Sequence, residues 1–80
     1  MESEEIKQRI HLLERAIALY EKMLTLAKTM YKDLKSEYEK TGSPFYEDLS
    51  KQAESQVKQI EQSLHKLQTE LAIYKDSPSN

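Results

Sequence analysis

The sequence predicts an all-α protein, an antiparallel hairpin of two long helices that pack like a coiled coil. Apolar residues recur at alternating intervals of four and three in both halves of the chain, the spacing that keeps one side of a long helix against another helix. A single cluster of Gly, Ser and Pro divides the two halves. The composition, with 38% hydrophobic and 32% charged residues, is typical of long helices.

The first helix is expected over about residues 3–40. Ser3 is the expected N-cap, and Glu4 and Glu5 follow in the first turn, where carboxylates interact favourably with the helix dipole. Neither Gly nor Pro interrupts the segment, so it should form a rod roughly 55 Å long. Its apolar seam consists of Ile6, Ile10, Leu13, Ile17, Tyr20, Leu24, Ala27, Tyr31, Leu34 and Tyr38.

The turn is expected at residues 41–44. Gly42 can adopt the left-handed conformation that ends a helix. Ser43 can cap the next helix, and Pro44 suits the first helical position because the N–H that proline lacks would be unpaired there. Since the connection is short, the two helices should lie antiparallel as neighbours. The alternative is one continuous helix that is kinked at Pro44.

The second helix is expected over about residues 45–75. Ser50 stands where the strict repeat expects an apolar residue, with Leu49 beside it. Folding about the turn pairs seam positions whose numbers sum to about 84, so that large residues face smaller ones, as interdigitating layers require. Residues 76–80 are polar and are expected to form a disordered tail. The seam consists of Tyr46, Leu49, Ala53, Val57, Ile60, Leu64, Leu67, Leu71 and Tyr74.

The first helix carries a second apolar row beside its seam, again at intervals of four and three. One neighbouring helix covers only a narrow seam, so this row should remain as an exposed strip roughly 25–30 Å long. Such strips usually mark an interface, and we expect the row to bind a partner or a second copy and so complete a helical bundle. The alternative is that the row only widens the seam within the hairpin. The row consists of Leu12, Ala16, Leu19, Met23, Leu26 and Met30.

Three aromatic residues, Tyr38, Phe45 and Tyr46, are expected to cluster at the turn end of the hairpin. Tyrosine at a seam position can bury its ring and direct its hydroxyl to the rim. The cluster therefore has two interpretations, ordinary core packing near the loop or a recognition patch at the hairpin tip.

The sequence offers no candidate for catalysis, so we expect a protein that is not an enzyme and that has no cofactor, metal or small-molecule substrate. Carboxylates are numerous, but a catalytic pair needs a sheltered cleft to separate its pKa values, and a hairpin offers none. Glu61 and His65 lie four residues apart and could form half of a metal site. A solvated surface run is the commoner explanation, and His11 also falls on a solvent face.

Charge and hydropathy argue against two further classes of partner. No run approaches the ~18 apolar residues that a membrane span needs. The acidic first residues are not followed by the apolar stretch of a signal peptide, which favours a cytoplasmic location. Lys28, Lys32, Lys35 and Lys40 line one end of the first helix, but acidic residues lie between them. The net charge of −2 also argues against nucleic acid as the main partner.

The expected function is a non-enzymatic protein–protein interaction module: an adaptor, a small chaperone or an assembly subunit. It would bind a helical partner or itself through the second row of the first helix. A small dimeric nucleic-acid-binding regulator, built as a four-helix bundle, is the alternative from a different class.

A resemblance to a known family adds a further alternative. The segment Lys40-Thr41-Gly42-Ser43-Pro44-Phe45-Tyr46, followed by Leu49, Ala53 and Ile60, resembles the small helical-hairpin co-chaperones of type III secretion systems. Those proteins have a Gly-containing turn, then an aromatic residue and a seam of Leu, Ala and Ile. The resemblance covers about half of the chain. It implies a cytosolic partner of needle-subunit chaperones.

Overall fold

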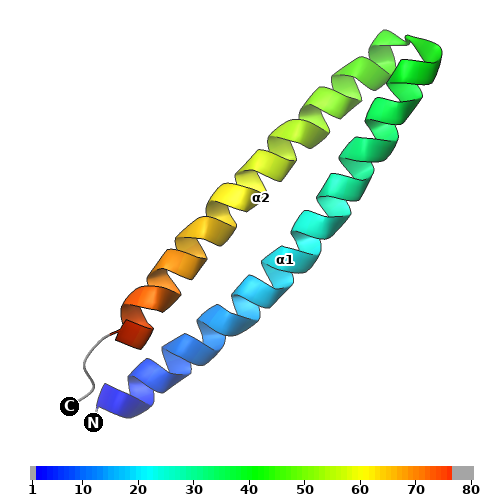
Figure 1. Cartoon of the computed structure of the whole chain (residues 1–80). Coiled ribbons are helices and arrows are strands. Elements are labelled where there is room, and N and C mark those ends of the chain that lie inside the picture. Colours follow the sequence, from blue (N-terminus) through cyan, green and yellow to red (C-terminus); the bar gives the residue numbers. More distant parts are fainter. Residues whose placement is uncertain (1, 77–80) are drawn as a thin grey trace.

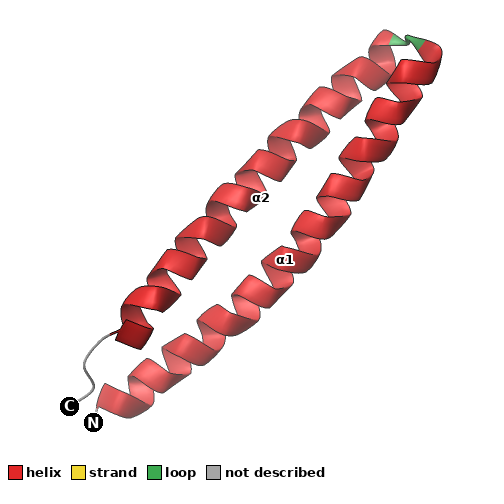
Figure 2. Ribbon diagram, in the orientation of Figure 1, coloured by secondary structure: helices red, strands yellow, loops and turns green. Residues whose placement is uncertain are grey.

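The computed structural model describes residues 2–76, which form two helices side by side (Figure 1). Helix α1 spans Glu2–Thr41 and helix α2 spans Pro44–Asp76. The helices run antiparallel, and the described part of the chain contains no strand (Figure 2). The molecule is a rod with dimensions of 61 × 14 × 13 Å. The predicted all-α hairpin is confirmed, and a single kinked helix is excluded.

Each helix extends one residue beyond the predicted bounds at both of its ends. Helix α1 begins at Glu2, so Ser3 lies inside the helix and its prediction as N-cap is wrong. A glutamate forms helix readily and suits the positive end of the helix dipole, which allows the helix to start earlier. Asp76, expected in the tail, belongs to α2, and the rest of the predicted tail lies outside the described residues.

Gly42 ends α1 in the left-handed conformation, with φ of +66°. Its N–H donates to the carbonyl oxygen of Tyr38 at 2.7 Å, the bond that closes a helix whose last residue is followed by a left-handed glycine. The Thr41 hydroxyl donates to the carbonyl oxygen of Glu37 at 2.9 Å and accepts the N–H of Ser43 at 3.2 Å. The N–H groups of Gly42 and Ser43 and the carbonyl oxygens of Glu37 and Tyr38 therefore have partners at this helix end.

Ser43 caps α2, as the sequence predicts. Its Oγ accepts the N–H of Phe45 at 3.2 Å, and its carbonyl oxygen accepts the N–H of Glu47 at 3.1 Å. Pro44 is the first helical residue. Because Gly42 reverses the chain and Ser43 starts the next helix at once, α2 has to return along α1.

The predicted seam forms the contact between the helices. All ten predicted positions on α1 are half-buried, and all nine on α2 are buried or half-buried. Among residues 3–76, whose burial is described, only three side chains are less than about a tenth exposed. They are those of Ser50, Ala53 and Leu64. Two helices therefore shield the seam from the sides without enclosing it.

Ser50 explains the irregular phase of the seam at the start of α2. It is only 8% exposed, so the strict repeat continues through this residue although its side chain is polar. The hydroxyl donates to the carbonyl oxygen of Glu47 at 2.9 Å, which satisfies the buried group within its own helix. Leu49 is half-buried beside it.

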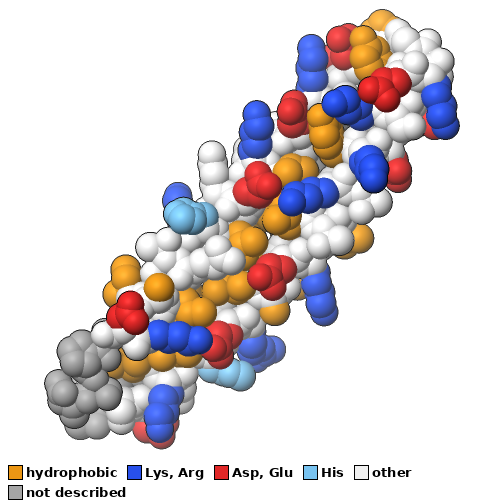
Figure 3. Space-filling model, in the orientation of Figure 1, with side chains coloured by type: hydrophobic (Ala, Val, Ile, Leu, Met, Phe, Trp, Pro, Cys, Tyr) orange, Lys and Arg blue, Asp and Glu red, His pale blue; other side chains and the backbone are white. Residues whose placement is uncertain are grey.

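Ion pairs connect the helices along one flank of the seam. Lys28 and Glu61 are 3.8 Å apart, and Lys75 and Glu14 are 3.2 Å apart. Figure 3 shows charged side chains of both signs along both helices, with a hydrophobic line between them. These side chains are about half exposed, so each pair should contribute less than about 1 kcal/mol and mainly fix the register.

Arg9 and Tyr74 join the helices at the open end of the hairpin. The Arg9 Nη1 donates to the Tyr74 hydroxyl at 3.0 Å. This bond, aided by attraction to Glu5 and Glu70, raises the pKa of Arg9 above its ordinary value. The predicted register places Tyr74 opposite Ile10. The observed bond joins Tyr74 to Arg9, the residue next to Ile10, and so agrees with that register.

Candidate protein-interaction face

The second apolar row of α1 is exposed in the hairpin. Leu12, Leu19, Met23, Leu26 and Met30 are between 40% and 71% exposed. Ala16 is half-buried and is the member of the row closest to being covered. Helix α2 therefore leaves the row uncovered, and a wider intramolecular seam does not account for it.

The geometry of the helical repeat explains why α2 does not reach this row. With Ile10 at heptad position a, the row occupies positions c and g. These positions lie on one side of the a/d seam, and position e lies on the other side. Lys28 and Glu14, which form the interhelical ion pairs, are at position e. The charged flank and the apolar row are therefore on opposite sides of the hairpin.

Helix α2 adds an uncharged strip to the same side as the row. In an antiparallel pair, the g positions of the two helices face each other across the seam. The repeat therefore places Ala16 and Met30 of α1 on the same side of the seam as Ser63 and Leu49 of α2. Ala16, Ser63 and Leu49 are all half-buried, as residues beside the seam should be. The c and g positions of this part of α2 are Leu49, Gln52, Gln56, Gln59 and Ser63.

We call the row of α1 together with this strip of α2 the neutral face. Between Leu12 and Met30 on α1, and between Leu49 and Ser63 on α2, no c or g position carries a charge. Phe45, at 64% exposure, stands at a c position near the turn. Phe45 therefore adds an exposed apolar side chain at the turn end of the α2 strip, whereas the c and g positions of α1 beyond Met30 are Asp33, Glu37 and Lys40.

The aromatic residues at the turn do not form one stacked group. The rings of Phe45 and Tyr46 meet edge to face, with centroids 5.3 Å apart and planes at 68°. Tyr38 is half-buried, and its hydroxyl donates to Glu47 Oε2 at 3.5 Å, a long hydrogen bond. The two tyrosines thus pack at the seam, as one interpretation predicted, while Phe45 extends into solvent and could contact a partner.

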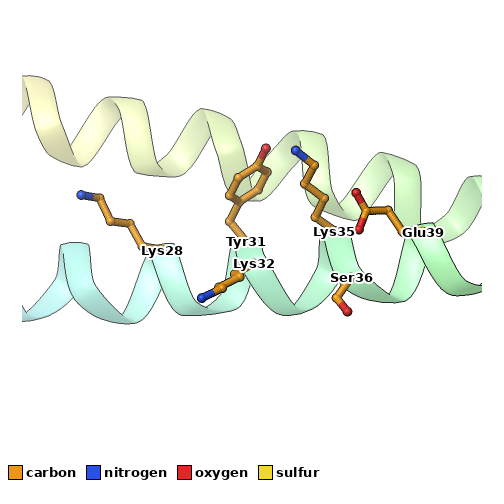
Figure 4. Close-up of a pocket in the computed structure, with 6 residues that line it drawn as sticks. All are labelled: Lys28, Tyr31, Lys32, Lys35, Ser36 and Glu39. Carbon is orange, nitrogen blue, oxygen red and sulfur yellow. The ribbon is translucent and has the colours of Figure 1, made fainter.

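The lysines near the turn end of α1 surround a shallow groove of about 560 Å³. Lys28, Tyr31 and Lys35 point towards α2, whereas Lys32 and Ser36 point away (Figure 4). Lys28 pairs with a glutamate of α2, and the Lys35 Nζ lies 5.8 Å from the centroid of the Tyr31 ring. These lysines are spread around the helix and partly neutralised, an arrangement that offers little to a phosphate backbone.

The described residues offer no centre for metal chemistry. Within residues 2–76, no three His, Cys, Asp or Glu side chains lie close enough together to hold a metal ion. His11 and His65 are both exposed. In the same range, neither helix has a stretch that is both long and apolar enough to cross a membrane. The neutral face is therefore the feature of the described chain with the most evident binding chemistry.

The sequence indicates the α1 half of the neutral face but not the α2 half. The row is visible in the sequence because its residues are apolar at a helical interval. The residues of α2 at the same side are mainly glutamine and serine, which produce no hydrophobic signal. The available signal was the lack of charge at c and g positions between Leu49 and Ser63, in a chain with 32% charged residues. That signal gains meaning only once the register of the helices is known.

No protein family model, no curated protein and no solved structure matches this chain. The resemblance to the type III secretion co-chaperones therefore depends on the residues of the turn and the start of α2 alone.

Proposed function

We propose that this protein is a non-enzymatic protein–protein interaction module that binds a helical partner or a second copy of itself through the row of α1. One observation carries the proposal. Five large aliphatic and thioether side chains form a continuous row on one helix and are 40–71% exposed. Soluble proteins rarely leave contiguous apolar strips in water unless the strip binds something. An adaptor, a small chaperone or an assembly subunit would each use such a surface.

The physical chemistry of the row suits a helical partner. A helix laid along α1 would contact residues at intervals of three and four, as in a coiled coil. Met23 and Met30 have flexible thioether side chains that adapt to differently shaped surfaces. The matching interval and the adaptable side chains support a helix rather than an irregular loop as the contacting element.

The gain from covering the row can be estimated from its exposure. The exposed fractions of the five side chains add up to about 2.9 whole side chains. At about 1.5–3 kcal/mol for a fully buried aliphatic side chain, covering them would contribute roughly 4–9 kcal/mol. Association itself costs about 4–15 kcal/mol in lost freedom. The row can therefore drive binding only with additional contacts around it.

The proposal is tested with a pair of matched double variants of the full chain. Met23→Glu with Leu26→Glu places two charges in the row, and Ala18→Glu with Thr25→Glu places two charges on the exposed polar side of the same helix. Size-exclusion chromatography with light scattering and pull-down from a native extract are run on both and on the wild type. We expect association of the wild type and the control, and its loss in the row variant. A wild type that stays monomeric and captures nothing would refute the proposal.

Circular dichroism separates loss of binding from loss of folding. The row side chains are exposed in the hairpin, so charges placed there should leave the helical signal close to that of the wild type. A row variant that loses its helical signal at every concentration would show that the row belongs to the folded core of the hairpin.

A further inference from the structure

We infer that the partner of the neutral face is a second copy of this chain, packed antiparallel so that two hairpins close into a four-helix bundle. This inference rests on the proposed function and names its partner. Three features of the structure support it. They are the area of one side of the rod, the distribution of charge on that side, and the pairing of row residues when two copies of α1 lie antiparallel.

The area of one whole side of the rod, which contains the neutral face and the charged positions beyond it, fits a stable dimer. A strip 25–30 Å long and one helix wide offers roughly 300 Å², well below the ~800 Å² per partner of a standard interface. The full side of the rod, with its length of 61 Å and width of 14 Å, offers roughly 850 Å². A partner that covers this area must be a straight rod about as long as this one, and a second copy meets that requirement.

The distribution of charge suits a surface that binds itself. A two-fold axis brings each surface onto its own copy, so charges near the axis meet charges of the same sign. On α1 the c and g positions are uncharged from Leu12 to Met30. On α2 they are uncharged from Leu49 to Ser63, towards the turn, and Lys66 and Glu70 occupy the next c and g positions. The opposite flank carries Lys28, Glu61, Glu14 and Lys75, which are already paired within the hairpin. These four paired charges are thus kept away from the side that would meet its own copy.

The row of α1 is complementary to itself when reversed. If the two-fold axis passes level with Glu21, each residue faces the one whose number completes a sum of 42. Leu12 then faces Met30 of the second copy, Leu19 faces Met23, and the small Ala16 faces the large Leu26. These are the c and g residues that an antiparallel helical pair brings into the same layers. The pair of Ala16 and Leu26 places a small side chain opposite a large one, as interdigitating layers require, and the other two pairs are large against large.

The same register continues into the charged residues beyond the row. Arg9 at position g would face Asp33 of the second copy at position c, and the symmetry creates this pair twice. Both side chains are exposed in the hairpin, and Arg9 also contacts Tyr74 and Glu5 within it. Lys22, at position f beside the axis, would approach Lys22 of the second copy at the outer rim. The rim repulsion offers a specific test, because removing the charge of Lys22 should relieve it.

The register is tested by disulfide trapping, since the chain contains no cysteine of its own. Leu12→Cys and Met30→Cys variants of the full chain are prepared separately, mixed, and oxidised with diamide. We expect a cross-linked dimer in the mixture and little in either variant alone, because identical residues in the antiparallel dimer would be about 27 Å apart by helix rise. Cross-linking of Leu12→Cys with itself would indicate a parallel pair and overturn the inference.

The contribution of the charged residues is tested by sedimentation equilibrium. Asp33→Arg should weaken the dimer about tenfold, because it replaces attraction to Arg9 of the second copy with repulsion. Lys22→Gln should tighten the dimer. An unchanged dissociation constant in both variants would overturn the register.

The failure of this inference can be distinguished from failure of the proposed function. A wild-type mass of twice 9.4 kDa that falls to 9.4 kDa in the Met23→Glu, Leu26→Glu variant supports both. A monomeric wild type that captures a partner through the row overturns the second copy and leaves the proposed function standing. A dimer that persists in the row variant places the contact elsewhere and overturns the inference.

Discussion

Truncating Leu64 or Leu26 to alanine separates the contribution of the seam to stability from that of the row. Leu64 lies in the seam and Leu26 lies in the row. Both residues are leucines in the middle of a long helix, but Leu64 is 9% exposed and Leu26 is 71% exposed. Truncation to alanine removes the same atoms at both positions and alters helix propensity equally. Any difference between Leu64→Ala and Leu26→Ala therefore reports what surrounds each side chain.

The expected magnitudes follow from burial. Leu64→Ala removes a buried side chain and leaves a cavity, which costs about 2–5 kcal/mol. In the single hairpin, α1 and α2 cover about three tenths of the Leu26 side chain, so Leu26→Ala should cost only about 0.4–0.9 kcal/mol. A small domain has a total stability of about 5–15 kcal/mol, so the first change alone could remove much of it.

Urea unfolding followed by circular dichroism measures both variants at a low protein concentration, at which light scattering shows a monomer. Leu64→Val, a smaller deletion, keeps the comparison measurable if Leu64→Ala is unfolded without urea. At a hundredfold higher concentration, the proposed dimer covers Leu26, and the cost of Leu26→Ala should rise towards that of Leu64→Ala. Equal costs at low concentration would refute the reasoning, because they would show that the row is already buried in the monomer.

Three further predictions concern the turn and the charged flank. Gly42→Ala should destabilise the hairpin by about 1–2 kcal/mol in urea unfolding, because its φ is +66° although a Cβ would meet no atom within 4 Å; Gly42→Asn should cost less. Ser43→Ala should lower the free energy of unfolding by about 1 kcal/mol in the same assay, because the cap is lost. Ser43→Asp should keep most of that stability, because aspartate also caps a helix. Glu61→Gln should cost less than about 1 kcal/mol at low salt and nothing measurable in 1 M NaCl, because Lys28 and Glu61 are 58% and 48% exposed. A larger, salt-independent cost would show that this pair is a structural requirement.

The seam and the turn could be predicted from the sequence because both depend on local rules. The interval of four and three identifies the side of a helix that is covered, and every predicted seam residue is at least half-buried. Gly42, Ser43 and Pro44 each have one conformational role that few other residues fulfil as well. Such signals survive without knowledge of the rest of the structure.

The features that the sequence did not reveal depend on contacts between the helices. Ser50 interrupts the apolar pattern, and only the packing of α2 on α1 shows that it is buried and bonded to Glu47. Ser3 has the right side chain for an N-cap, but the helix already begins at Glu2. The α2 half of the neutral face can be identified only from the structure. The interhelical ion pairs show which flank of the hairpin is charged, and the α2 residues of the neutral face lie on the other flank.

The adjacent outer ends of the two helices determine how the hairpin would respond to mechanical force. The start of α1 and the end of α2 lie at the same end of the rod, opposite the turn (Figure 1). A force that pulls these ends apart loads the first contacts alone, beginning with Arg9 and Tyr74 and then the pair of Lys75 and Glu14. The seam would open one layer at a time towards Gly42, as a zipper does, instead of shearing along its whole length. The hairpin should therefore yield easily when its two chain ends are pulled apart.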